Sequence, residues 1–361
     1  MTAPPTTSTS AAATPASPGT PAPAAAPVGS PALEGPVSVP AGAVSDTTGE
    51  GRLGALLGLL AYGLWGLFPL YFHLLAPSGA FEILGHRILW TFGVCLVVLA
   101  VRRDFGFVPS LLRSPRLLGG VAAAGVFIAV NWVIYVGAVL SGHVTEAALG
   151  YFLNPIVTVA LGVVVLRERL RGMQWVALVA GLAGAVYLAV AAGKPPWIAL
   201  SLAVSFAMYG LLKNRLGTRL SAVHSLAAET AALTPVAVAV LAVLAIRHET
   251  TFLASGPAHP VLLAVSGIVT ALPLLLFAAA ARRLPLVTVG LMQFLTPVMQ
   301  LVIGVAVLGE TMSTARWIGF AVVWLALLIL AADSIRSTHR RHRAGNAARR
   351  AGGPEPVAER H

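Results

Sequence analysis

The sequence has 361 residues, of which 57% are hydrophobic and only 10% are charged, with a net charge of +11 and a mean hydropathy of +0.84. Soluble domains are about 45–50% apolar and about 25% charged, so this composition excludes an ordinary soluble enzyme and indicates an integral membrane protein. A single cysteine, Cys95, excludes an intrachain disulfide and a metal site built from several cysteines. We therefore predict neither a metal nor a cofactor.

The chain begins with a leader, residues 1–52, that is rich in proline and alanine. Ten of the 25 prolines lie within its first 50 residues. It contains no apolar run able to form a packed core, so we predict a disordered cytoplasmic tail. The positive start and continuous apolar core of a secretory signal peptide are also missing.

Long apolar runs follow the leader. About 20 consecutive apolar residues suffice to cross a bilayer as a helix, and strict two-residue alternation, which would indicate a barrel, is not seen. We therefore predict an all-α integral membrane protein. The ten expected spans are 53–75, 81–101, 117–139, 145–165, 173–192, 196–212, 222–246, 260–281, 286–308 and 314–332.

Basic residues are distributed very unevenly over the segments between the spans. With the N-terminus inside, 20 of the 24 lysines and arginines fall in cytoplasmic segments and three fall outside. Basic residues are retained on the cytoplasmic side, so both termini are predicted to be cytoplasmic. The count includes a basic tail at 333–361, which lacks apolar periodicity and is expected to be disordered. The positive charge is thus interpreted as a topology signal, and no nucleic-acid partner is expected.

The sequence also contains an internal repeat. The fourth and ninth spans align without a gap at an offset of 142 residues, which pairs Pro155 with Pro297. The two halves, 53–192 and 196–332, then hold five spans each. Because five is odd, the second copy must cross the membrane in the opposite sense. Inverted repeats of this kind are typical of secondary transporters.

Three stretches carry a resemblance to a known family: Tyr62–Gly66, Glu82–Trp90 and Gly150–Pro155. They resemble the EamA family of the drug/metabolite transporter superfamily, and within it the RarD-type permeases described as chloramphenicol-sensitive. The segment from Glu168 to Trp175 fits the same subgroup. The resemblance covers about residues 53–332 and implies movement of a metabolite or drug. It implies no catalytic residue.

Two charged residues, Arg87 and Glu229, lie about six or seven residues inside expected spans. A charge at the bilayer centre costs at least about 2.5–3.5 kcal/mol to insert. Arg87 can be interpreted as an anion contact, such as a substrate carboxylate, or as a side chain that reaches the headgroups. His86 adjoins it. Glu229 can be a proton carrier, a cation contact, a partner of Arg87, or a structural carboxylate hydrogen-bonded between helices.

Polar and aromatic residues supply further candidates for a substrate-binding wall. Asn131 is interpreted as a helix–helix hydrogen bond or, together with Trp132, as part of that wall. Trp65 and Tyr209 occupy related positions in the two repeats, and either cavity lining or core packing accounts for them.

Two prolines interrupt their spans at equivalent positions. Asn154 precedes Pro155, and Gln293 lies four residues before Pro297. Proline removes a backbone donor and frees the carbonyl one turn back, so paired interruptions indicate hinges and a midplane binding site. Prolines also occur in membrane helices for packing alone.

The motifs of ATP hydrolysis, zinc proteases and serine hydrolases are absent from the sequence. We therefore predict a secondary transporter of a small organic solute in the cytoplasmic membrane, working by alternating access and favouring export, with a proton or ion as a possible coupling partner. The alternatives are an intramembrane enzyme using Glu229 with His86, and a membrane receptor or regulator. Small residues such as Gly181 permit a homodimer but do not establish one.

Overall fold

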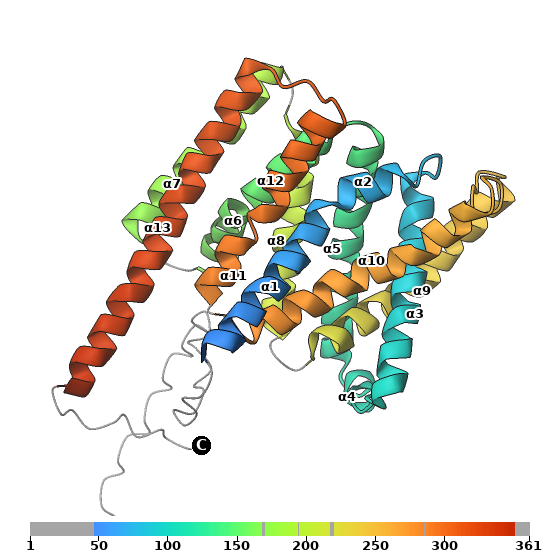
Figure 1. Ribbon diagram of the computed structural model, residues 1–361, viewed down its shortest axis with the longest axis horizontal. Coiled ribbons are helices and arrows are strands. Elements are labelled where there is room, and N and C mark those ends of the chain that lie inside the picture. Colours follow the sequence, from blue (N-terminus) through green and yellow to red (C-terminus); the bar gives the residue numbers. More distant parts are fainter. Residues whose placement is uncertain (1–46, 168–169, 194, 217–219, 285, 351–361) are drawn as a thin grey trace, which may run out of the picture. The chain divides into compact units, whose positions relative to one another are not determined.

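The computed structural model describes residues 47–167, 170–193, 195–216, 220–284 and 286–350 (Figure 1). Within these residues every regular element is a helix, and ten helical segments are long and apolar enough to cross a membrane. The prediction of an all-α protein with ten spans is confirmed. The leader before residue 47 lies outside the described residues.

The first repeat contains seven helices, because two short ones accompany the five spans. The first span is interrupted at Leu67, directly before Pro69 occupies the first turn of the next helix. The bounds are α1 Thr47–Gly66, α2 Phe68–His73, α3 Ala80–Arg102, α4 Phe107–Leu112, α5 Pro115–Leu140, α6 Val144–Leu166 and α7 Gly172–Ala192.

The second repeat differs from the prediction in its last two spans. The ninth span is not one continuous helix: it consists of two α-helices and a π-helical turn, labelled η2. The helix of the tenth span continues to Arg350, whereas we expected a disordered tail from 333. Alanine and arginine, which are frequent in this tail, favour helix, so the helix extends beyond the span. The bounds are α8 Trp197–Leu216, α9 Ala222–Ile246, α10 Ala258–Ala281, α11 Leu286–Met292, α12 Leu295–Val302, η2 Ile303–Val307 and α13 Thr314–Arg350.

Most of the spans form a closed cycle of contacts. In order around the cycle, each helix packs on the next: α6, α8, α5, α9, α3, α10, α1, α12 and back to α6. The remaining two spans, α7 and α13, pack on each other and lie side by side at one edge in Figure 1. The buried core therefore lies largely between helices of different repeats.

The packing follows the repeat. The counterparts in the two repeats are α1 and α8, α3 and α9, α5 and α10, α6 and α12, and α7 and α13. When each helix is exchanged for its counterpart, the contact of α1 with α10 becomes that of α8 with α5, and the contact of α6 with α8 becomes that of α12 with α1. The pairs α3 with α9, α7 with α13 and α6 with α12 map onto themselves. Two five-span repeats that exchange in this way, with an odd number of crossings each, are inverted with respect to one another.

Candidate functional site

Arg87 is enclosed by side chains of α2, α5 and α10. Its side chain, on α3, is 3% exposed. The Nε atom donates to Thr270 Oγ1 on α10 at 2.8 Å. The guanidinium carbon lies 4.0 Å from the ring centroid of Trp132 and 5.2 Å and 5.4 Å from those of Phe72 and Phe68. These contacts hold the cation among aromatic faces.

Aromatic rings continue from this cage along α5 and α6. Phe72 contacts Tyr135 with ring centroids 6.0 Å apart, and Tyr135 contacts Tyr151 at 5.6 Å. The break between α1 and α2 supplies Phe68 and Phe72, so Pro69 contributes to the cage by starting a new helix there. The hydroxyl of Tyr135 is buried without a hydrogen-bond partner among the described residues. It is a free polar group on the same ring wall as Arg87.

Asn131 joins three helices. Its Nδ2 donates to the Leu202 carbonyl and to Ser205 Oγ, both at 3.1 Å, and its Oδ1 accepts from the Tyr151 hydroxyl at 3.2 Å. All of its side-chain polar atoms are therefore engaged between helices of the two repeats. This placement supports the helix–helix interpretation of Asn131, while Trp132, the next residue, covers Arg87.

Glu229 belongs to a separate buried cluster. Its side chain is 1% exposed, and Oε1 lies 2.7 Å from Lys213 Nζ. Ser225 Oγ donates to the same oxygen at 2.8 Å, and the Tyr209 hydroxyl donates to Oε2 at 3.3 Å. Lys213 also contacts Ser225. The carboxylate is thus paired with Lys213 and not with Arg87.

Sequence reasoning missed two residues of this cluster, Lys213 and Ser225. Lys213 counted only as a topology signal, because it lies near the end of an apolar run. In the structure α8 continues to Leu216 and carries Lys213 back to the α9 carboxylate. No local sequence pattern reports such a contact between two helices.

His86 faces the segment between α9 and α10. Its ring stacks on Phe252 with centroids 4.6 Å apart and an interplanar angle of 11°. His86 therefore lies in a different cluster of contacts from Glu229.

A cross-repeat polar network, which we call the latch, lies beside His86. Buried Glu82 accepts from Thr251 N at 2.7 Å and from Thr251 Oγ1 at 2.8 Å. Ser78 Oγ lies 2.5 Å from Thr251 Oγ1 and 2.7 Å from His259 Nε2. The latch, defined as Ser78, Glu82, Thr251 and His259, ties the start of α3 in the first repeat to the α9–α10 segment of the second.

The two prolines behave differently. Pro155 lies inside the continuous helix α6, whereas the helix is interrupted at Gln293 and Phe294 before Pro297. Asn154 Oδ1 is buried without a partner among the described residues.

The glutamine that lies inside the protein is Gln300. The candidate Gln293 has an exposed side chain. Gln300 is 2% exposed, donates through Nε2 to the Trp65 carbonyl at 3.2 Å, and leaves its Oε1 without a described partner. Trp65 itself packs edge to face on Tyr62.

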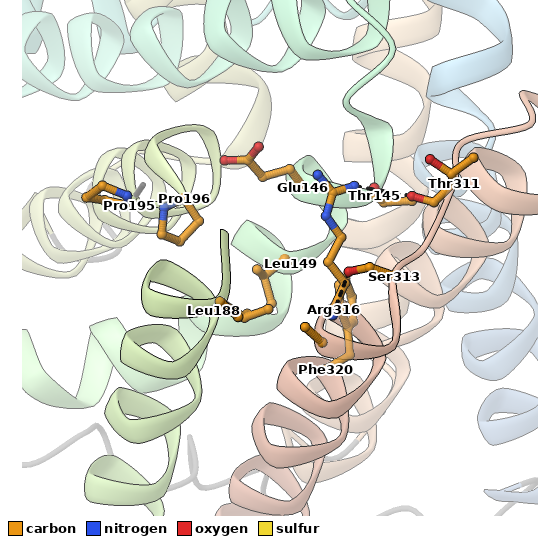
Figure 2. Close-up of a pocket in the computed structure, with 12 residues that line it drawn as sticks. Thr145, Glu146, Leu149, Leu188, Pro195, Pro196, Thr311, Ser313, Arg316 and Phe320 are labelled. Atoms are coloured by element: carbon orange, nitrogen blue, oxygen red, sulfur yellow. Dashed lines mark hydrogen bonds between the residues drawn. The ribbon is translucent and has the colours of Figure 1, made fainter. Parts of the chain in front are cut away.

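A cavity of about 370 Å³ lies away from these residues (Figure 2). It is bordered by the starts of α6, α8 and α13 and by the end of α7. Figure 2 shows Arg316 reaching across it from α13 toward α6, and Arg316 Nη1 donates to the Thr311 carbonyl at 3.3 Å. None of the residues predicted from sequence as site residues lines it.

Ten apolar helices arranged as two inverted repeats, with charged side chains enclosed between them, define a multi-pass membrane protein of the transporter class. The comparison with protein families makes this specific. The model of the EamA-like transporter family matches twice, at residues 52–190 and 195–332. The chain belongs to this family, and each match corresponds to one five-span repeat.

Curated relatives agree with this assignment. The chain is 49% identical over 291 residues to "Protein RarD" of Streptomyces exfoliatus, covering 81% of this chain and 92% of that protein. It is 38% identical over 290 residues to "Protein RarD" of Escherichia coli K12, covering 80% and 97%. A solved crystal structure that is 20% identical aligns with a TM-score of 0.51, covering 76% of this chain and 96% of that one, and so shares the fold. The resemblance to RarD-type permeases is confirmed.

Proposed function

We propose that this protein is a secondary transporter that moves a small organic metabolite or drug across the cytoplasmic membrane by alternating access, in the export direction. The observation that carries the proposal is the exchange of helix contacts between the two repeats. In transporters with inverted repeats, equivalent contacts of the two repeats permit one arrangement open to each side of the membrane. Rocking one repeat against the other interconverts them.

The contacts that must break in such a movement are polar and join the repeats. The latch is one of them. In addition, Glu310 of the second repeat accepts from Val144 N at 2.5 Å and Thr145 N at 2.8 Å at the start of α6. Glu146 of the first repeat accepts from Ile198 N at 3.1 Å at the start of α8. Carboxylates on helix N-termini are favourable but exchangeable with water, which suits a gate.

The first test asks whether the protein moves a solute. Cells expressing the parent and cells without it are compared by metabolomics of cytoplasm and medium. We expect at least one small organic compound to accumulate in the medium only with the parent. Unchanged profiles in both compartments would contradict the export proposal.

A second test addresses the mechanism through the latch. In a Cys95→Ala background, Ser78→Cys and Thr251→Cys place two thiols where the hydroxyl oxygens are 2.5 Å apart. Oxidation should lock the two repeats together and stop flux, and a reductant should restore it. The single Ser78→Cys variant is the control and should respond to neither reagent. Full flux through the oxidised pair would contradict rocking at this end of the bundle.

A further inference from the structure

Arg87 is a buried cation without an anionic partner among the described residues, and this raises the question of what it binds. Arg87 is 3% exposed, and within the described part of the chain no carboxylate lies within 4.0 Å of its guanidinium. Of the two buried glutamates, Glu229 already has Lys213 as its partner, and Glu82 accepts hydrogen bonds from Thr251. An ionised group in low dielectric is costly unless it is paired and hydrogen-bonded. Arg87 is therefore the one enclosed charge in the described residues that still needs an anion.

The guanidinium has a free donor to offer such an anion. Nε is occupied by Thr270, which fixes the orientation of the planar group. Nη1 is buried and has no hydrogen-bond partner among the described residues. Arginine presents its donors in a rigid fork that matches a carboxylate. The Tyr135 hydroxyl, unpartnered and packed on the same Phe72 ring, is a second donor on this wall.

From this geometry we infer that Arg87, held by Thr270 and covered by Trp132, is the binding point for the carboxylate of an organic monoanion with an aromatic body. The inference deepens the proposed transport function and rests on it. One carboxylate balances the single cation, whereas a phosphate ester would bring about −1.5 to −2 charges and leave an excess negative charge enclosed.

The body of the ligand is assigned from the walls. Phe68, Phe72 and Trp132 present their rings to the cation, and Tyr135 and Tyr151 continue the row of rings from Phe72. Aromatic pairs in offset or edge-to-face contact are stabilised beyond the burial of their area. An aromatic carboxylate would neutralise the charge of Arg87 and also pack on the surrounding rings. A carboxylate with a long aliphatic chain would only neutralise the charge.

Binding is tested on the purified full-length protein in phosphatidylcholine nanodiscs, which contain no anionic lipid. The probes are benzoate and phenylacetate, each compared with its neutral amide, and phenyl phosphate. We expect both carboxylates to bind more tightly than their amides and than phenyl phosphate. Carboxylates that bind no better than the amides would overturn the inference, and so would tighter binding of phenyl phosphate.

Variants identify the binding point. Arg87→Gln should weaken carboxylate binding by about tenfold to a hundredfold, the range for a hydrogen bond to a charged group, and should abolish the preference over the amides. Arg247→Gln removes one exposed arginine and is the matched control, expected to bind as the parent does. Arg87→Lys keeps the positive charge, so it tests the assignment even if Arg87→Gln does not fold. It should retain the preference for carboxylates at reduced affinity. Unchanged binding in Arg87→Gln would overturn the assignment.

Binding and transport can fail separately. Carboxylate binding that depends on Arg87, combined with no flux in the metabolomic comparison, would keep the site and overturn the transporter. Flux of a solute with no dependence on carboxylate charge or on Arg87 would keep the transporter and overturn the site.

Discussion

A close approach of backbone to backbone between the two repeats gives a prediction whose size can be worked out. At Gly267, on α10, a Cβ atom would lie 2.4 Å from the carbonyl carbon and 2.5 Å from the oxygen of Trp90 on α3. These are backbone atoms, so no rotamer change relieves the contact. Ordinary contact begins near 3.4 Å, so Gly267→Ala must separate the two helices by about 1 Å.

The expected cost can be estimated from two opposing effects. Alanine is intrinsically better than glycine in a helix by about 1 kcal/mol. Overpacking a rigid contact costs about 1–3 kcal/mol and occasionally more, and a backbone neighbour places this site at the upper end. The net destabilisation is then about 2 kcal/mol, or about 3 °C in melting temperature at an unfolding entropy of about 2.1 cal/mol/K per residue.

The same displacement reaches the candidate site. Thr270 lies about one turn after Gly267 on α10, and Arg87 lies about one turn before Trp90 on α3. A shift of about 1 Å between the helices stretches the 2.8 Å bond from Arg87 Nε to Thr270 Oγ1 beyond hydrogen-bond range. Gly267→Ala should therefore weaken carboxylate binding as well as stability.

Thermal melting of the purified protein in nanodiscs measures the effect. Gly93→Ala, on α3, is the matched control, because its Cβ would meet nothing within 4 Å. The control should melt at or above the temperature of the parent. If Gly267→Ala melts as high as the parent, the contact between α3 and α10 is not as close as described and the argument fails.

Two further predictions concern charge. Lys213→Met leaves the Glu229 carboxylate without its cation and should destabilise the protein by about 1–3 kcal/mol. This cost is less than that of breaking a fully buried pair, because Lys213 is 31% exposed. Adding Glu229→Leu should recover most of the melting temperature, and additive losses in the double variant would show that the two side chains do not interact. The distribution of basic residues predicts that both termini face the cytoplasm, so reporters fused to either end should be protected from external reagents, and external labelling of either one would contradict this topology.

The class of the protein, the number of spans, the repeat and the family could all be predicted from the sequence alone. Each of these properties follows from consecutive residues or from a comparison along the sequence. A span is about 20 consecutive apolar residues, and a repeat is a similarity at a fixed offset, so neither requires knowledge of contacts. The offset that pairs Pro155 with Pro297 also required the inversion, because each copy crosses the membrane an odd number of times.

Only the tertiary structure decided which polar groups meet. Sequence reasoning selected Arg87 and Glu229 because charge inside an apolar run is conspicuous, but their partners, Thr270 and Lys213, lie on other helices. It selected Gln293, whose side chain is exposed, while Gln300 is buried. Lipid is as apolar as a protein core, so a membrane helix shows little difference between its two faces in hydrophobicity. The inward face is therefore fixed by how the helices pack, and that information is not present in any single segment of the chain.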